Sequence, residues 1–151
     1  MRSRPAEVSR TPFFKMISSA VILQNHHIRP SAQRLVIFDY LRENKVHPSV
    51  DSIYQALLPE HPGLSRTTVY NTLELLAKCG LVVPLDFGEG YLRYDGETIP
   101  HSHFQCERCG AVIDIMESPA ECEKMLPRGS SLSSASLYLR GRCPKCNSAK
   151  P

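Results

Sequence analysis

Four cysteines in this chain have the spacing that a structural zinc site requires. Cys106 and Cys109 form one CxxC pair, and Cys143 and Cys146 form a second pair near the end of the sequence. Four thiolates arranged in two such pairs are the usual ligands of a closed, tetrahedral zinc site. Because a closed site has no open coordination position, we expect it to hold the fold together and not to catalyse a reaction.

A second group of possible metal ligands surrounds the first CxxC pair. Asp95, His101, His103 and Asp114 offer carboxylate oxygens and imidazole nitrogens, which suit iron or manganese better than a thiolate cage does. His101 and His103 are two residues apart in an expected strand, so both rings project from the same face. Of the other histidines, His47 is the best placed to join them, because it lies just before an expected helix.

Composition limits the class of protein. The 151 residues, 42% of them hydrophobic, allow one large globular domain or two small ones. The longest dense apolar run is far too short to cross a membrane, and the N-terminus lacks the apolar segment of a signal peptide. We therefore expect a cytoplasmic protein, in which paired CxxC motifs bind metal and do not form disulfides.

The net charge of +3 resides in the first fifteen residues, and the rest of the chain is balanced. Residues 1–12 contain two prolines and no helical periodicity, so we expect a flexible N-terminal arm. A basic arm can follow a nucleic-acid backbone, and it can equally be a tail without a role.

The pattern of apolar residues predicts four helices and a hairpin before residue 95. The expected helices are Phe13 to about Asn25, a second one capped by Ser31, a third one that Pro48 and Ser49 open and that ends near Pro59, and a fourth one from Ser65 to Cys79–Gly80. Strands Leu81–Phe87 and Tyr91–Tyr94 would form the hairpin. Three helices followed by a hairpin constitute a winged helix-turn-helix, with the first helix as an addition.

The fourth expected helix has an apolar stripe and a polar face. The stripe consists of Val69, Leu73 and Leu76. The polar side chains that we expect to contact DNA are Arg66, Thr67, Thr68, Tyr70 and Asn71. Asn can pair with adenine, and a Thr methyl group can contact the methyl group of thymine. The alternative is that this face is only solvated, as most polar helix faces are.

After the hairpin the sequence predicts a small α/β domain, residues 96–151. Its expected strands are His101–Cys106, Ala111–Ile115 and Leu132–Leu139, with a short helix near Ala120–Leu126. Cys79 and Cys122 have no partner at metal-ligand spacing, so we expect them to be small buried apolar residues. The predicted fold class is thus α+β, with a winged-helix domain at residues 13–95 that ends in a hinge.

Six motifs in this order resemble the ferric uptake regulator (Fur) family, from about Phe13 to Cys146. They are Arg29-Pro-Ser-Ala-Gln-Arg34, His47-Pro-Ser-Val-Asp-Ser-Ile-Tyr54, Thr67-Thr-Val-Tyr-Asn71, Arg93-Tyr-Asp95, His101-Ser-His103 and the two CxxC pairs. The resemblance implies a homodimeric, metal-dependent repressor that binds double-stranded operator DNA and is not an enzyme. It also implies structural zinc on the four cysteines and a regulatory Fe²⁺ or Mn²⁺ site. The implied regulatory ligands are His47, Asp95, His101, His103 and Asp114.

The two acidic ligand positions distinguish branches of the family. Iron-uptake regulators commonly have glutamates there, and peroxide sensors (PerR-like) have aspartates, as this chain does at Asp95 and Asp114. We therefore expect a peroxide-responsive repressor, in which peroxide is the only small-molecule signal and its Fenton reaction at ferrous iron oxidises His47 or His101. The alternative within the family is an iron-responsive repressor of iron uptake.

An Asp/His cluster can also activate water in a metallohydrolase. We disfavour this alternative because no additional general base is evident in the sequence. A zinc-ribbon interaction module would leave the oxygen and nitrogen ligands unexplained. A metal that links His47 to the hinge and the C-terminal domain would instead favour one angle between the domains, and a dimer reads two half-sites only at the correct spacing.

Overall fold

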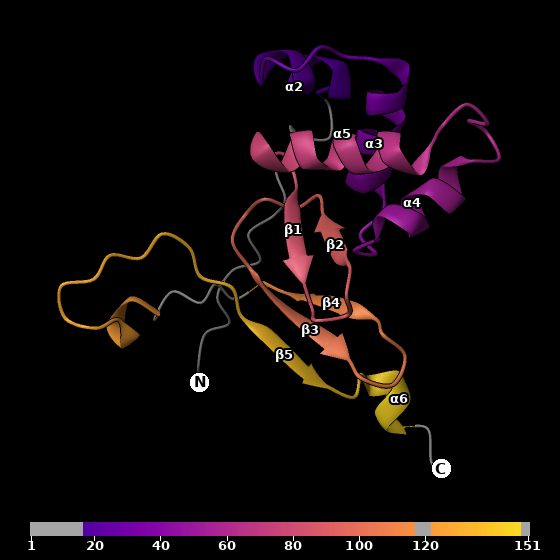
Figure 1. Ribbon diagram of the computed structural model, residues 1–151. Coiled ribbons are helices and arrows are strands. Elements are labelled where there is room, and N and C mark those ends of the chain that lie inside the picture. The colour runs from indigo at the N-terminus through magenta and orange to yellow at the C-terminus, as the bar shows by residue number, and fades with distance from the viewer. Residues whose placement is uncertain (1–16, 117–121, 149–151) are drawn as a thin grey trace.

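The computed structural model describes residues 17–116 and 122–148, which form a helical half followed by two small β-sheets (Figure 1). The helical half contains α2 (Ser19–Asn25), α3 (Ala32–Glu43), α4 (Val50–Leu57) and α5 (Arg66–Lys78). The remaining elements are β1 (Val83–Asp86), β2 (Leu92–Asp95), β3 (Ser102–Cys106), β4 (Val112–Ile115), the short 3-10 helix η1 (Cys122–Met125), β5 (Tyr138–Gly141) and α6 (Pro144–Ser148). The expected N-terminal arm, residues 1–12, lies outside the described residues.

Serine residues cap the N-termini of the helices. Ser31, Ser49 and Ser65 precede α3, α4 and α5, and each hydroxyl accepts a hydrogen bond from the backbone N–H three residues further on. Such caps satisfy N–H groups that have no partner within the helix. The three helix starts expected from the sequence are therefore confirmed. Ser18 caps α2 in the same way, and the earlier part of the expected first helix, residues 13–16, lies outside the described residues.

The helices enclose an apolar core. Phe38 of α3, Ile53 of α4 and Leu73 of α5 are all fully buried, and the expected stripe of α5 is confirmed along its whole length. In α2, Val21 is exposed while Leu23 is fully buried. This short helix buries the face that carries Leu23 against α3.

A hairpin wing follows the helices, as the sequence predicts. β1 and β2 pair antiparallel, and the turn between them contains Gly88 and Gly90, whose φ angles of +73° and +83° favour glycine. The Asp86 carboxylate accepts a hydrogen bond from the backbone N–H of Gly88 at 2.8 Å, which stabilises the turn. Asp95 is the last residue of β2, so the wing ends on a candidate metal ligand.

The second sheet has the strand order β4-β3-β5, with β3 antiparallel to β4 and parallel to β5. The strand expected at 132–139 was wrong in extent, because β5 spans Tyr138–Gly141 and the serine-rich segment before it forms no strand. The short helix expected at 120–126 is the 3-10 helix η1, and the first two residues of that range lie outside the described residues.

The two faces of this sheet differ in chemistry. Asp114 and Tyr138 lie directly opposite His103 on the neighbouring strands, so these three side chains share one face. Phe104, the next residue of β3, has Ile113 and Leu139 opposite it on the other face. The first face contacts His47 and Phe87 from the N-terminal part of the chain, and the second is an apolar row in which Ile113 and Leu139 are each more than 40% exposed.

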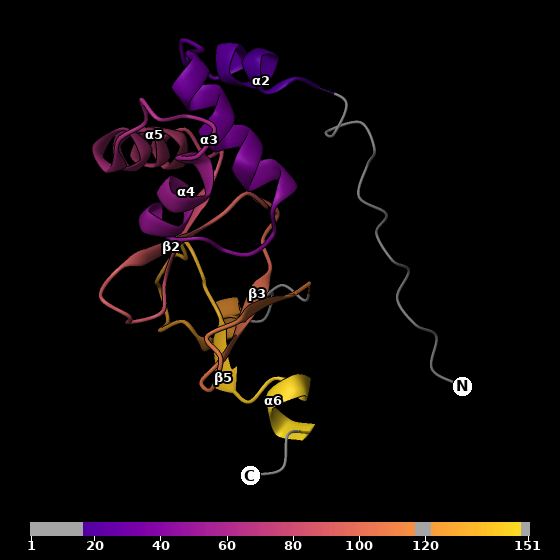
Figure 2. The same cartoon turned by 90° about the vertical axis from the view of Figure 1, so that its right-hand side faces the viewer.

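The wing packs against the second sheet (Figure 2). Phe87, at the end of the first wing strand, is buried with its ring 4.9 Å from that of Tyr138 and 6.3 Å from that of His103. The guanidinium of Arg140 in β5 donates a hydrogen bond to the carbonyl of Phe87. The wing, which belongs with the helices to the N-terminal half of the chain, is thus in direct contact with the second sheet of the C-terminal half, beside His103. In the part of the chain that the structure describes, no helix has the length and apolar content to cross a bilayer.

Candidate metal centres

His47 lies in the loop between α3 and α4 and is held against the end of the wing. The carbonyl of the next residue, Pro48, accepts a hydrogen bond from the backbone N–H of Tyr94 at 2.9 Å. Ser49 and Arg93 form an isolated antiparallel bridge beside it. His47 itself has a φ of +48°, a left-handed conformation that is uncommon for a non-glycine residue. These contacts direct the imidazole of the helical half toward Asp95.

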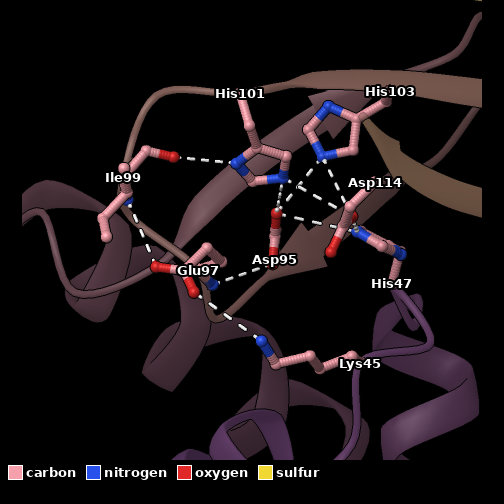
Figure 3. A network of polar contacts seen from close by, with 8 residues as sticks. All are labelled: Lys45, His47, Asp95, Glu97, Ile99, His101, His103 and Asp114. Atoms are coloured by element: carbon pink, nitrogen blue, oxygen red, sulfur yellow. Dashed lines mark hydrogen bonds and ion pairs between the residues drawn. The ribbon is translucent and has the colours of Figure 1, made fainter. Parts of the chain in front are cut away.

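Asp95 presents one carboxylate oxygen to the backbone and the other to the imidazoles. Its Oδ1 accepts a hydrogen bond from the backbone N–H of Glu97 at 2.8 Å, which leaves Oδ2 facing His47, His101 and His103 (Figure 3). Burial raises the pKa of Asp95, but the hydrogen bonds from His103 and Glu97 and the nearby imidazole of His47 outweigh burial and lower the pKa well below its usual range. Asp95 is therefore a buried anion.

The remaining ligands come from the second sheet. His103 lies in β3 directly opposite Asp114 in β4, and His101 lies just before β3 with its ring centroid 4.4 Å from that of His103. The Nδ1 of His101 is 2.8 Å from the carbonyl oxygen of Ile99, to which it can only donate. This hydrogen bond places the proton on Nδ1 and leaves Nε2 as the ligand atom that faces the two carboxylates.

Five side-chain atoms converge on one point. The distances between imidazole and carboxylate atoms run from 2.7 Å, between His47 Nε2 and Asp114 Oδ1, to 3.8 Å, between His103 Nε2 and the same oxygen, and all five atoms lie within 4.8 Å of one another. Ligand atoms about 2.1 Å from a shared ion lie roughly 3–4 Å from one another. The Nε2 atoms of His47 and His101 and the Oδ1 of Asp114 are buried and have no hydrogen-bond partner. Polar atoms that approach one another without bonding are arranged as ligands around a cation, so this set fits a divalent metal.

The charge of the cluster also favours a cation. Burial lowers the pKa of His47, but the nearby carboxylates of Asp95 and Asp114 outweigh burial and raise the pKa above its ordinary value. The histidine ligands and Asp95 are at most 5% exposed, and Asp114 is 20% exposed. Two carboxylates in so closed a site require compensating positive charge, which a divalent ion supplies.

The four cysteines of the CxxC pairs form a second cluster at the far end of β3. Their sulfur atoms all lie within 4.8 Å of one another, and the Sγ atoms of Cys109 and Cys143 are 3.8 Å apart. Sulfurs about 2.3 Å from a tetrahedral zinc lie roughly 3.8 Å from one another, so the spacing fits this metal. Cys106 and Cys143 are buried, and no disulfide links the described cysteines.

The thiols of this cluster differ in acidity. Hydrogen bonds from the backbone N–H groups of Cys143 and Cys109 lower the pKa of Cys106 to about 6. The hydrogen bond to Cys143 and burial raise the pKa of Cys146 to about 12. Four adjacent thiols therefore do not all ionise unless a cation shares the site. Among the described residues, neither Cys79 nor Cys122 joins a group of metal ligands. Cys79 packs against the helical core, as expected, and Cys122 is half-buried in η1.

The expected DNA-contacting residues lie together on α5. Arg66, Thr67, Tyr70 and Asn71 are exposed, and Thr68 is half-buried with its hydroxyl 2.8 Å from that of the capping Ser65. At helical spacing the four exposed residues share one face of the helix. The sequence therefore identified a continuous polar surface.

Two features beside this surface were missed by the sequence analysis. Arg29 and Arg34 line an open hollow of about 480 Å³ between the start of α3 and Asn71. Arg66 contacts two residues of α4, Asp51 and Tyr54. The two arginines at the start of the second expected helix were the available signal for the first feature. No local pattern indicates the second feature, because it depends on how α4 packs against α5.

Known proteins of similar sequence identify the family of this chain. The sequence model of the ferric uptake regulator family matches residues 25–140. The peroxide-responsive repressor PerR of Staphylococcus saprophyticus is 38% identical over 97 residues, which are 64% of this chain and 66% of that protein. The matched region therefore spans just under two thirds of the length of this relative.

Two solved structures have a similar fold. The manganese-containing ferric uptake regulator of Pseudomonas aeruginosa is 27% identical and covers 85% of this chain and 99% of its own, with a TM-score of 0.66. The peroxide stress regulator of Campylobacter jejuni is 26% identical and covers 86% of this chain and 100% of its own, with a TM-score of 0.63. Because the family match covers residues 25–140, well over half of the chain, the chain belongs to the ferric uptake regulator family.

Proposed function

We propose that this chain is a metal-dependent, homodimeric repressor of transcription that releases its operator DNA in response to peroxide. The observation that carries the proposal is the five-ligand site, because His47 comes from the helical half and His101, His103 and Asp114 come from the second sheet or its edge. An ion bound there favours the arrangement in which the halves are held together. The names of the relatives, a peroxide-responsive repressor and a peroxide stress regulator, support this function.

The two clusters would hold different metals. Cys106, Cys109, Cys143 and Cys146 would bind structural zinc, which fixes the end of β3 to the C-terminal segment. His47, Asp95, His101, His103 and Asp114 would bind regulatory Fe²⁺ or Mn²⁺, for which mixed oxygen and nitrogen ligands are suited. We propose the same domain division as the sequence predicts: a winged-helix domain at residues 13–95 and a dimerisation domain at residues 96–151.

DNA would be read by the exposed face of α5. Its side chains, Arg66, Thr67, Thr68, Tyr70 and Asn71, include hydrogen-bonding groups that can reach base edges in a major groove. The adjacent hollow with Arg29 and Arg34 provides positive charge for the phosphate backbone. Such contacts orient a protein on DNA without selecting a sequence, so base selection would fall to α5.

A second copy of the chain would cover the apolar face of the second sheet. Phe104, Ile113 and Leu139 form a row across three strands, and Ile113 and Leu139 are exposed in the single chain. Ile113→Lys is expected to convert the dimer to a monomer in sedimentation experiments, because a buried ammonium would replace an apolar contact. Val46→Lys, at an exposed position in the helical half, is the matched control and should leave the dimer intact.

The peroxide response would depend on the imidazoles that face the two aspartates. These residues would hold ferrous iron, which would supply the electron that activates peroxide beside the rings. In the net reaction, one peroxide oxygen adds to a ring carbon of His47 or His101, the other leaves as water, and the imidazole is oxidised while peroxide is reduced. The oxidised ring is a poorer ligand, so the contact between the two halves is lost and the operator is released.

An iron-responsive repressor of iron uptake is the second candidate, favoured by the similarity to solved ferric uptake regulators. A metallohydrolase is disfavoured, because the ligands are nearly closed to solvent and the relatives are regulators. Binding of the dimer to a random-sequence duplex library, with Mn²⁺, with Fe²⁺ or without metal, tests repressor function. A peroxide sensor would lose binding and gain one oxygen on a His47 or His101 peptide only in the iron form. Iron-form binding that persists after stoichiometric peroxide, without this oxygen gain, would favour the iron-uptake regulator.

A further inference from the structure

Arg66 is held in place by two residues of the preceding helix. It is the first residue of α5, and its Nε donates a hydrogen bond to the Oδ1 of Asp51 at 2.7 Å. Its guanidinium carbon lies 4.4 Å from the centre of the Tyr54 ring, within the range of a cation–π contact. Asp51 and Tyr54 both belong to α4, so the arginine joins the two helices of the helix-turn-helix.

The hydrogen bond to Asp51 uses one edge of the guanidinium, and the Tyr54 ring covers one of its faces. The hydrogen bond to Asp51 uses Nε, and in the part of the chain that the structure describes Nη1 and Nη2 of Arg66 have no hydrogen bond. The side chain is 57% exposed, so this pair of donors is accessible. Arginine presents its donors as a rigid planar fork, and a fork that is already oriented loses less conformational entropy when it binds a ligand.

The surroundings favour a base over a phosphate as the ligand of this fork. The carboxylate of Asp51 offsets the charge of Arg66 and would repel phosphate oxygens. Guanine presents two neutral acceptors, O6 and N7, at the spacing of the two terminal nitrogens of arginine. The N-terminal residues of a recognition helix are also those that contact base edges in helix-turn-helix proteins. Arg66 has this position in α5.

We propose that Arg66 reads a guanine in each operator half-site through Nη1 and Nη2, and that Asp51 and Tyr54 are positioning residues for it. The inference rests on the proposed DNA-binding function and deepens it, because it assigns one base to one side chain. It also gives the Asp51–Arg66 ion pair a role other than stability, since exposed pairs of this kind contribute little.

The test is selection from a random-sequence duplex library with the Mn²⁺-loaded dimer of each variant. The wild type should select a guanine at one position per half-site, and Arg66→Ala should lose this preference. Affinity for the best wild-type site should fall about 5- to 150-fold, the range for loss of one bidentate base contact. Lys78→Ala, which removes a positive charge from the exposed far end of the same helix, should keep the guanine.

Positioning by Asp51 has a separate readout. Asp51→Asn should retain the guanine preference but weaken it relative to the other positions of the site, because a neutral amide orients Arg66 less firmly. A purely structural role of Asp51 would lower affinity equally for all sequences. Melting temperatures of the variants, measured beside the wild type, separate an effect on folding from an effect on base selection.

The dependence of affinity on salt distinguishes a base contact from a phosphate contact. A base contact predicts that Arg66→Ala leaves the slope of log affinity against log salt unchanged, whereas loss of a phosphate contact would reduce it by about 0.9. A reduced slope with unchanged base preference would overturn the assignment, and so would a wild-type site without guanine. If the metal-loaded wild type binds no duplex at all, the proposed function itself fails.

Discussion

Replacing His47 with asparagine tests whether the metal joins the two halves of the molecule. His47 is the only one of the five proposed ligands that lies before α4, and its Nε2 is 2.7 Å from Asp114 and 3.6 Å from Asp95. Asparagine tolerates a φ of +48° better than most residues, so the loop can keep its conformation. The shorter side chain cannot reach the position of the imidazole nitrogen. The substitution therefore removes a ligand with little change in the backbone.

The expected magnitude follows from the number of ligands. Loss of a supporting group around a metal costs about 10- to 100-fold in affinity, and we take about 100-fold for a direct ligand. At a Mn²⁺ concentration of about 100 times the wild-type Kd, the ion stabilises the wild type by roughly 2.7 kcal/mol and a variant with 100-fold weaker binding by roughly 0.4 kcal/mol. For a chain of this size, each kcal/mol raises Tm by about 2–4 °C. The Mn²⁺-induced shift should thus fall from about 5–11 °C to about 1–2 °C.

Thermal unfolding with and without Mn²⁺ measures this difference. Manganese is preferred over iron because it avoids oxidation during heating. His61→Asn is the matched control, since His61 also precedes a proline but belongs to no group of metal ligands among the described residues. The control should keep the wild-type shift. A His47→Asn variant that also keeps the full shift would refute the assignment of His47 as a ligand, and with it the proposed link between the two halves.

Three further predictions concern the parts that support the site. Gly96→Ala should lower the free energy of unfolding by about 1–3 kcal/mol in urea titrations, because its Cβ would lie 2.7 Å from the carbonyl oxygen of Leu41. Gly63→Ala, whose Cβ would meet nothing within 4 Å, should be close to neutral, and equal effects of the two changes would contradict the reasoning. Phe87→Ala should lower the free energy of unfolding by about 3–5 kcal/mol, measured in the same way, because this buried ring packs between the wing and the second sheet. A decrease of less than about 1 kcal/mol would show that the contact is not maintained in solution. Chelation of zinc should make four more thiols reactive toward a thiol reagent and should lower Tm, and unchanged reactivity would exclude the four-cysteine site.

The sequence predicted the helical half well because its signals are local. A serine before each of α3, α4 and α5 marked the first turn, and the stripe of α5 followed from helical periodicity alone. The position of β5 could not be predicted in this way. Its start is set by parallel pairing with β3, more than thirty residues earlier in the chain, and not by the composition of the serine-rich segment before it.

The ligand set was predictable for a different reason. Residues two apart in a strand share a face, so His101 and His103 could be placed together from the sequence, and the antiparallel register confirms Asp114 opposite His103. His47 was singled out only by its place just before an expected helix, and its role as a ligand was implied by the family resemblance, since no spacing rule connects it to β3. The contacts of Phe87 with the second sheet have no sequence signal, because they depend on how the two halves pack together.

The alternation of residues along β3 restricts how this protein can evolve. His103 faces the regulatory ligands, the next residue Phe104 lies in the apolar row, and Cys106 at the end of the strand belongs to the zinc cluster. Insertion or deletion of one residue before His103 in this strand would exchange its faces and damage the proposed metal site and the proposed dimer surface at once. Substitutions can adjust each site separately, but the length of the strand cannot change. Variation in length is therefore expected in the segment before β5 and not within β3.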